Sequence, residues 1–456
     1  MGELSMRLVV EPADALLDVP RRIRVEGAPA GAAVRVAIET DWPDGGRWAG
    51  GATFLADAEG VVDATRDPPL EGSYSGVSAM GLIWSQEKRL AASTADATGP
   101  LAARPVQSRL TAEAGTLRAA TAMTARFKAP GVTRRELREN GLVGTLFLPP
   151  GDGPHPAVVV LYGSGGGINE PRAALLASHG FAALALGYFG APGLPRYISN
   201  TPLEMFTRGI DWLRAAVSPP GGFVAVSGQS RGGELALLLG ATFPDRVSAV
   251  VAYVPGAVVH GAMSAADPAQ GGRDGHAWTL EGRPIPHVWE SNRTASWAPY
   301  DEAAAPRRHA RGVETALGDA EAVAAARIPV ERIRGPVLSI SGTDDGSWPS
   351  TRYAEMVQEA LTAANHPWPH AHLAFEGAGH AISHPYQPTT HIAWPHPVSG
   401  IVTTGGGTAA ANAQASEASW HAMLTFLRDA AASVAGQERI SHHASATARP
   451  VERPVE

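Results

Sequence analysis

The chain has 456 residues, of which 44% are hydrophobic and 18% charged, and its formal net charge is -7. This length exceeds what one hydrophobic core usually supports, so we expect two domains and a tail. The negative net charge argues against a nucleic-acid partner, because such a partner requires a basic face. The chain has no cysteine, which excludes disulfides, a thiol nucleophile and thiolate metal ligands.

The beginning of the chain has no basic segment followed by an apolar run, so we expect no secretory signal. No stretch approaches the ~20 consecutive apolar residues that a membrane-spanning helix needs. A cytoplasmic location without a membrane partner is therefore expected. The sequence gives no indication of the oligomeric state.

Residues 1–130 contain short segments in which apolar and polar residues alternate, separated by turn-forming residues. Many short alternating segments at this spacing predict an Ig-like antiparallel β-sandwich. The clearest predicted strands are Arg7–Glu11, Arg21–Glu26, Ala33–Ile38 and Gly81–Ser85.

Residues 131–436 have a different pattern, in which apolar runs alternate with helix-like segments. Continuous apolar strands alternating with helices predict a parallel sheet that is buried on both faces, which is the α/β class. The apolar runs are Ala157–Tyr162, Phe181–Leu186, Phe223–Ser227, Ala249–Val254, Val337–Ser341 and His372–Phe375.

Three further segments bear on the domain organisation. We place the domain boundary near residues 130–140, where Arg134–Glu139 is expected to be a linker or an edge segment. Residues 258–325 form a polar insertion, rich in Ala, Arg and Asp, that we expect to cover an active site. Residues 437–456 lack core residues and are expected to be disordered.

The strongest chemical signal is the pentapeptide Gly228-Gln-Ser230-Arg-Gly232. In a nucleophile elbow, a serine lies on a tight turn between a strand and a helix, and the flanking positions must be small. The apolar run that ends at Ser227 and the helix-like run from Glu234 provide that setting. The pattern therefore predicts an α/β-hydrolase with Ser230 as its nucleophile. The alternative is an ordinary turn in which Ser230 caps the helix.

A serine hydroxyl needs a base to remove its proton, and the base needs a carboxylate to hold its tautomer. In α/β-hydrolases these partners follow the serine in the order Asp, His. Asp344 and Asp345 follow one predicted strand, and His380 follows the next. The distance from Gly342 favours Asp345 over Asp344. For Asp345 the alternative is a helix N-cap, and for His380 it is a turn residue.

The negative charge that develops on the substrate oxygen needs two backbone N–H donors. We expect one from Arg231, at the start of the predicted helix, and the second from the loop Tyr162–Gly167, with Ser164 the best candidate. A phosphate loop is the alternative for this glycine-rich run, but no Gly-Lys-Ser/Thr follows it.

The remaining polar residues give weaker signals. The carboxylate of Glu234 lies close enough in sequence to reach the elbow, although a charge at a helix N-terminus is the simpler explanation. His366, His370 and His372 lack the spacing of metal ligands and are expected to be surface residues. We therefore expect neither a metal site nor a cofactor.

In these residues and in the motifs around them, the chain resembles the acyl-CoA thioesterase and bile-acid-CoA:amino-acid N-acyltransferase family. The resemblance runs from about residue 6 to 430, and its motifs follow one another in the order and with the gaps typical of the family. They are Gly72–Gly76, Met80–Trp84, Gly141–Pro149, Gly163–Gly167, Ser230–Leu235, Ile328–Glu331, Gly342–Asp345, Trp348, Gly379–His380 and Pro385–Tyr386.

The resemblance implies an N-terminal β-sandwich joined to an α/β-hydrolase domain, and it places the triad on Ser230, Asp345 and His380. It also implies a small-molecule acyl thioester or ester as the substrate. In the amino-acid-conjugating branch of this family the nucleophile is cysteine. Serine at position 230 therefore favours hydrolysis over transfer.

Three kinds of function remain open. The first is hydrolysis of acyl thioesters through an acyl-serine intermediate, with general carboxylester hydrolysis as a variant. The second is acyl transfer to an amine or alcohol, which uses the same machinery. The third is a catalytically silent binding protein on a hydrolase fold. The sequence does not fix the acyl chain, or whether the donor is CoA, a carrier protein or a simple ester.

Overall fold

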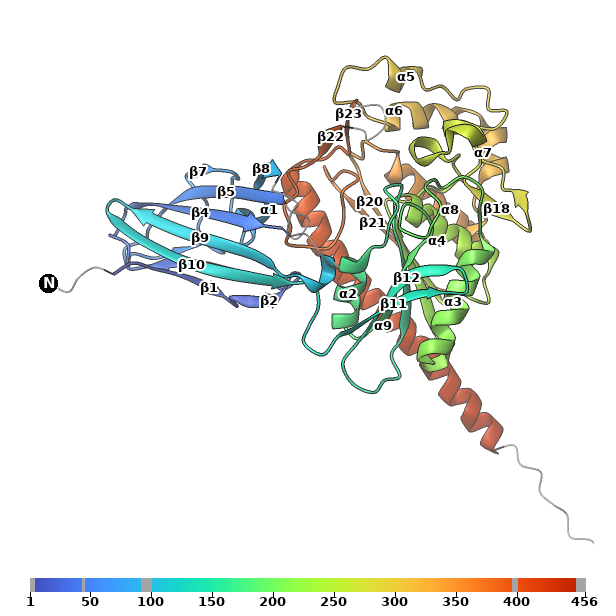
Figure 1. Cartoon of the computed structure of the whole chain (residues 1–456), viewed down its shortest axis with the longest axis horizontal. Coiled ribbons are helices and arrows are strands. Elements are labelled where there is room, and N and C mark those ends of the chain that lie inside the picture. The colour runs from blue at the N-terminus through green and yellow to red at the C-terminus, as the bar shows by residue number, and fades with distance from the viewer. Residues whose placement is uncertain (1–4, 43–45, 92–100, 396–400, 448–456) are drawn as a thin grey trace, which may run out of the picture.

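The computed structural model describes residues 5–42, 46–91, 101–395 and 401–447. Figure 1 shows a strand-rich N-terminal part on the left and a mixed part on the right, with the long helix α9 (Ala409–Thr447) beginning where the two parts meet and running to the lower right. No helix in the described residues combines the length and apolar character needed to cross a membrane.

The N-terminal part consists of two sheets that share one apolar core. A three-stranded sheet has the order β1-β3-β6, and a seven-stranded sheet has the order β2-β10-β9-β4-β5-β7, with β8 also paired to β5. Leu8 and Val25 of the first sheet and Val36 and Leu110 of the second belong to the same buried cluster. The strands are β1 (Arg7–Glu11), β2 (Asp14–Leu16), β3 (Arg22–Glu26), β4 (Ala33–Asp41), β5 (Gly46–Leu55), β6 (Val62–Asp63), β7 (Glu71–Gly72), β8 (Glu87–Ala91), β9 (Val106–Ala114) and β10 (Leu117–Arg126).

One predicted strand of this part is a helix instead. Residues Gly81–Trp84 form the short helix α1, whereas the apolar run Gly81–Ser85 predicted a strand. The helix buries Leu82 and Ile83 in the sandwich core. A side chain at Gly81 would meet the ring of Tyr74 at 2.3 Å, so the close contact with this ring requires glycine. Trp84 also packs on this core, and its carbonyl accepts a hydrogen bond from Thr389 N at 3.0 Å.

The second part is built on an eight-stranded sheet with the order β11-β12-β14-β13-β16-β17-β20-β21. The first two pairings, β11 with β12 and β12 with β14, are antiparallel, and the others are parallel. This order and the strand–turn–helix unit at its centre confirm the predicted α/β-hydrolase fold. The strands are β11 (Thr133–Glu139), β12 (Leu142–Leu148), β13 (Ala157–Leu161), β14 (Ala182–Gly187), β16 (Val224–Gln229), β17 (Ala249–Tyr253), β20 (Val337–Gly342) and β21 (His370–Phe375).

Helices cover both faces of this sheet, as the continuous apolar strands predict. The helices α3 (Glu204–Val217), α4 (Arg231–Thr242) and α8 (Ser350–Ala363) contribute to one buried cluster. The helices α2 (Glu170–Ser178) and α9 contribute to the other, which also includes Leu17 and Phe127 from the N-terminal side. The second cluster therefore joins the sheet to the sandwich.

Three predictions about the domain organisation can be compared with the structure. The segment between β10 and β11 covers residues 127–132, which overlaps the start of the boundary region expected at 130–140, and the division into separate domains stays a prediction. The segment Arg134–Glu139 lies in the edge strand β11. Residues 437–447, which were expected to be disordered, lie in α9, which continues to Thr447. Residues 448–456 lie outside the described residues.

The insertion 258–325 contains short elements above the sheet (Figure 1). Although it looked polar, it buries Trp278, Val288 and Trp297 in the same cluster as α3 and α4. The elements of the insertion are η4 (Met263–Ala265), η5 (Pro268–Gln270), η6 (Gly272–Asp274), β18 (Trp278–Leu280), β19 (Arg283–Pro284), α5 (Ala298–Asp301), α6 (Ala310–Val313), η7 (Glu314–Gly318) and α7 (Ala320–Ala326). The other short elements of the second part are β15 (Thr201–Pro202), η3 (Pro220–Gly222), η8 (Val330–Arg332), β22 (Ala393–Pro395) and β23 (Val402–Thr404), and η2 (Leu101–Ala103) belongs to the N-terminal part.

Candidate active site

The turn between β16 and α4 holds Ser230 in a conformation that few non-glycine residues adopt, with φ 59° and ψ -122°. Glycine is required on both sides of it. A Cβ at Gly228 would lie 1.9 Å from the carbonyl oxygen of Gly232, and one at Gly232 would lie 2.5 Å from that of Tyr162. The Ser230 amide donates to the Tyr253 carbonyl at 2.8 Å, which ties the turn to β17. Strain of this kind is typical of functional sites.

Ser230, His380 and Asp345 form a continuous chain of hydrogen bonds. The Oγ of Ser230 lies 2.8 Å from Nε2 of His380. The Nδ1 of His380 lies 2.8 Å from Oδ2 and 3.0 Å from Oδ1 of Asp345. The structure thus brings together three residues that lie 150 and 35 positions apart in the sequence. This is the geometry of a nucleophile, a base and an orienting carboxylate.

The choice between the two aspartates follows from their different partners. Asp345 is buried, and its Oδ1 accepts the Ser347 N–H at 2.8 Å in addition to facing His380. Asp344 points elsewhere: its carboxylate accepts from Arg308 at 2.7 Å and from the Gly407 N–H at 2.9 Å. Partial burial acts to raise the pKa of Asp344, but these two hydrogen bonds outweigh it and lower the pKa. Asp344 is therefore a structural anion, and Asp345 faces the imidazole.

Two segments of backbone lie beside Ser230 at positions suited to an oxyanion. Arg231 is the first residue of α4, where N–H groups have no partner within the helix. Tyr162–Gly165 lines the same cavity as Ser230, and a Cβ at Gly163 would lie 3.2 Å from that of Ser230. Among the hydrogen bonds of the described residues, the amides of Ser164 and Arg231 have no acceptor. Both predicted donors are thus available to a ligand.

The cavity in front of Ser230 has a volume of about 450 Å³. The insertion covers one side of it through Met263, Ser264 and His309. These three residues also line a second cavity of about 160 Å³, which continues toward Trp297 and Tyr300. The other residues lining the first cavity are Gln229, Ser347, Trp348, His380, Ala381, Trp394, Thr403 and Thr404.

A buried ionic network lies beside the turn that holds Ser230. Arg231 Nη1 lies 2.9 Å from both carboxylate oxygens of Glu234, and Nη2 donates to the Gly261 carbonyl at 2.7 Å. Trp278 Nε1 donates to Glu234 at 3.0 Å, so the insertion is bound to the same carboxylate. Burial raises the pKa of Glu234, and Arg231 opposes this effect. Glu234 is therefore neither a surface charge nor part of the reacting centre.

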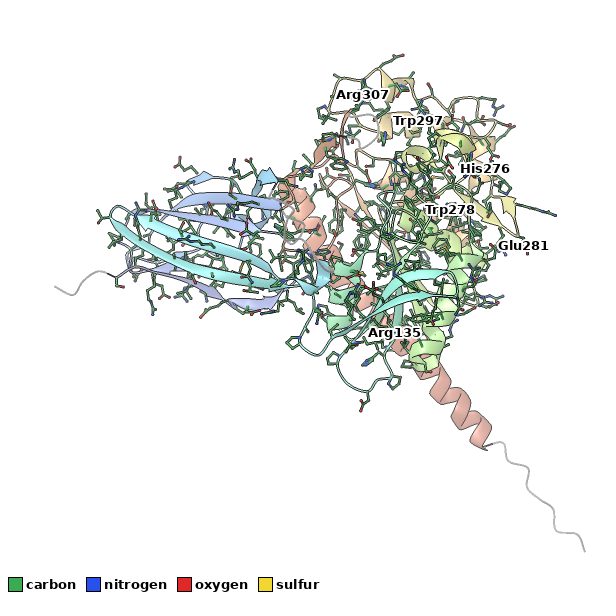
Figure 2. All side chains as sticks on the ribbon, in the orientation of Figure 1. Arg135, His276, Trp278, Glu281, Trp297 and Arg307 are labelled. Carbon is green, nitrogen blue, oxygen red and sulfur yellow. The ribbon has the colours of Figure 1, made fainter. Side chains whose placement is uncertain are left out.

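The network continues through His260. Its Nε2 lies 2.8 Å from the hydroxyl of Tyr353, and Trp289 Nε1 donates to its Nδ1 at 3.3 Å. Burial lowers the pKa of His260 well below its ordinary value, so the ring is neutral. Sequence reasoning missed this network, because its members come from separate segments without a common motif. Figure 2 shows Trp278 in the region of the insertion.

The histidines outside the Ser230–His380–Asp345 chain have different surroundings. His370 Nδ1 lies 2.7 Å from Gln358, and His372 Nε2 lies 2.7 Å from the Ser341 hydroxyl, so these rings pair with neighbouring side chains. Within the described residues, one group has the composition of a metal site: His276, His287 and Glu290 in the insertion. This group was not predicted from the sequence, since His-x10-His-x2-Glu matches no common metal motif.

Two family models match this chain. The acyl-CoA thioester hydrolase/BAAT N-terminal region covers residues 18–139, and the BAAT/acyl-CoA thioester hydrolase C-terminal region covers residues 201–433. Acyl-coenzyme A thioesterase 1 of Rattus norvegicus is 31% identical over 434 residues, which are 93% of this chain and 96% of the relative. The chain belongs to the acyl-CoA thioester hydrolase/BAAT family.

Two further relatives match this chain with similar identity and over similar lengths. Acyl-coenzyme A thioesterase 1 of Mus musculus is 32% identical, covering 82% of this chain and 84% of the relative. The peroxisomal succinyl-coenzyme A thioesterase of Mus musculus is 29% identical, covering 93% of this chain and 96% of the relative. The family resemblance seen in the sequence motifs is therefore confirmed over most of the chain.

Proposed function

We propose that this protein hydrolyses acyl-CoA thioesters, with Ser230 as nucleophile, His380 as general base and acid, and Asp345 as the carboxylate that orients His380. The observation that carries the proposal is the hydrogen-bonded chain from Ser230 Oγ to Asp345 on a nucleophile elbow. Membership of a family whose models are named for acyl-CoA thioester hydrolases supports the choice of substrate.

In the first half of the reaction, His380 Nε2 takes the proton of Ser230 as Oγ attacks the thioester carbonyl. The carbonyl oxygen becomes negatively charged, and the N–H groups of Ser164 and Arg231 stabilise it. The carbon–sulfur bond then breaks, His380 returns its proton to the leaving sulfur, and the acyl group remains on Ser230.

In the second half, His380 removes a proton from water, which attacks the acyl-serine ester. The carbon–oxygen bond to Ser230 breaks, and the serine recovers its proton from the imidazolium. Asp345 stabilises the positive ring in both halves without itself taking a proton. The products are the free thiol and the carboxylic acid.

The acyl group is assigned to the cavity in front of Ser230. Its volume of about 450 Å³ falls within the usual range for small-molecule sites. Met263, Trp348 and Trp394 give it apolar surface, and the insertion contributes the first of these. We therefore infer that the insertion takes part in selecting the acyl chain.

A cytoplasmic location stays a prediction from the sequence. The names of relatives include a mitochondrial thioesterase and a peroxisomal one, so members of the family occupy several compartments. Imaging of the full chain in its own cells measures this directly.

The substrate class is tested by a panel of acyl-CoA, acyl-pantetheine and aryl ester substrates, in which a thiol-reactive dye measures thiol release from the thioesters and absorbance measures the phenol released from the aryl esters. Because the chain has no cysteine, the protein itself gives no background signal. The proposal expects higher kcat/KM for acyl-CoA than for aryl esters. Turnover of aryl esters alone would contradict it.

Mass spectrometry with glycine or taurine present separates hydrolysis from transfer, since transfer yields an amide.

A further inference from the structure

The insertion gathers two histidines and one glutamate from separate segments. His276 follows η6, and His287 and Glu290 follow β19. The potential ligand atoms of all three lie within 4.8 Å of one another. Both imidazoles present Nε2 to the same carboxylate oxygen: His287 Nε2 lies 3.5 Å from Glu290 Oε1, and His276 Nε2 is in closer contact with it. Figure 2 shows His276 near Trp278, at the right of the view.

The burial of the group is uneven. The side chain of His287 is only 2% exposed, and its Nε2 has no hydrogen-bond partner in the described part of the chain. A buried polar atom without a partner is uncommon in proteins and calls for an explanation. His276 and Glu290 are 32% and 38% exposed, so solvent reaches the group from one side.

We propose that His276, His287 and Glu290 bind one divalent transition-metal ion, with Zn²⁺ as the expected occupant. Two imidazoles and a carboxylate are a common donor set for zinc, and a water on the exposed side completes a tetrahedron. The two nitrogen ligands disfavour Mg²⁺ and Ca²⁺, which select oxygen. The ion also supplies the partner that His287 Nε2 lacks.

Coordination through Nε2 requires a neutral ring with its proton on Nδ1. The Trp289 N–H donates to Nδ1 at 3.3 Å, and this long hydrogen bond must break when Nδ1 carries the ring proton. The competing arrangement is an ion pair between protonated histidine and Glu290, without a metal.

The proposed metal site lies next to the segment 261–264, which forms part of the cavity wall in front of Ser230. The Ala262 amide donates to the Gly275 carbonyl at 2.7 Å, next to His276, and a Cβ at Gly261 would lie 3.5 Å from the His287 ring. The residues that follow, Met263 and Ser264, line the cavity in front of Ser230. Zinc therefore ties together the segments that support this wall of the cavity, and we expect it to raise the melting temperature.

The test uses the full chain without a histidine tag, stripped with EDTA and dialysed. Zn²⁺ is titrated in competition with a chromophoric chelator, and Co²⁺ is added separately to record its visible spectrum. We expect one ion per chain and the visible bands of four-coordinate cobalt. H276N and E290Q should each weaken binding by at least ~10-fold, because even changes outside the ligand shell cost 10–100-fold. Both residues are partly exposed, and circular dichroism checks that the variants fold.

Two control variants address other histidines. H442N/H443N removes the adjacent pair near the end of the chain, and H366N removes a partly buried ring elsewhere. Both should bind zinc like the parent. Three results would overturn the proposal: no saturable binding at one ion per chain, equal affinity in H276N and E290Q, or loss of binding in a control variant. If a variant fails to fold, the zinc titration of the parent still tests the proposal, because it shows by itself whether one ion binds per chain. None of these measurements depends on thioesterase activity.

Discussion

Arg231 and Glu234 form an ion pair in the interior of the protein, with both carboxylate oxygens 2.9 Å from the same guanidinium nitrogen. The side chains are 1% and 0% exposed. They lie one helical turn apart on α4, directly after Ser230, and both also bind the insertion. The pair therefore connects the elbow to the wall of the cavity.

Breaking this pair should destabilise the protein strongly. Glu234→Ala leaves the buried guanidinium without its counter-charge, and such changes cost about 3–5 kcal/mol. Chemical unfolding followed by tryptophan fluorescence measures the loss. The matched control is Glu359→Gln, which breaks the exposed pair with Arg352 at 2.7 Å and should cost less than about 1 kcal/mol. Equal losses in the two variants would show that the buried pair has no special weight.

The two adjacent aspartates should differ in their effect on catalysis. Asp345→Asn removes the carboxylate that faces His380 and should reduce kcat by about 10³–10⁴-fold, with the fold unchanged. Asp344→Asn removes an acceptor of Arg308 and should leave kcat within about tenfold of the parent. Steady-state rates on one acyl-CoA decide the question. A larger loss in Asp344→Asn would assign the orienting role to the other carboxylate.

His384 should make the protein sensitive to acid. Burial, with a smaller contribution from Arg172, lowers its pKa to about 4, against the ordinary 6.5. Between these values the unfolded chain binds a proton that the folded protein does not, so stability is full above about pH 6.5 and falls toward pH 4. The difference corresponds to about 3 kcal/mol.

The measurement is the free energy of unfolding at pH 7 and pH 4.5, for the parent and for His384→Gln. Glutamine keeps a polar side chain but does not titrate, so the variant should lose less stability on acidification. Other titrating groups are common to both proteins and cancel in the comparison. Identical pH dependence in the two proteins would rule out His384 as the source.

The hydrolase part should depend on the sandwich for its solubility. Leu17 and Phe127 pack in one buried cluster with Trp420 of α9, and Tyr386 packs into the sandwich core. Trp420 Nε1 also donates to Asp18 at 2.8 Å. A chain shortened to residues 131–456 exposes these surfaces and should aggregate or lose activity. Gel filtration and thioesterase assays test this, and a soluble fragment with parental activity would show that the sandwich is dispensable.

Sequence reasoning selected the three residues of the hydrogen-bonded chain because each follows a strand in a local pattern. Ser230 lies in a glycine-flanked turn, and His380 and Asp345 follow the last two strands of the sheet. Open α/β sheets place their sites at these strand ends, so the three-dimensional meeting point follows from the chain order. Six of the eight strands of the sheet were predictable as apolar runs, whereas β11 is charged and its segment was expected only as a linker or an edge segment.

Features that depend on long-range packing were not predictable in this way. Gly81–Trp84 is apolar enough for a strand, but the contact of Gly81 with Tyr74 accompanies a helical turn there. The links from Glu234 to Trp278 and from His276 to His287 join segments that have no periodic pattern in common. Only the folded insertion brings these residues together.

The central claim is that Ser230 carries the acyl group, and the initial rate of acyl-CoA hydrolysis by Ser230→Ala tests it most directly. The variant should fold like the parent, because alanine removes only the hydroxyl and Ser230 makes no side-chain cap bond to α4. Its kcat/KM should fall by at least about 10³-fold, as with nucleophile removal in other triads. A folded Ser230→Ala protein with a rate within tenfold of the parent would contradict the account.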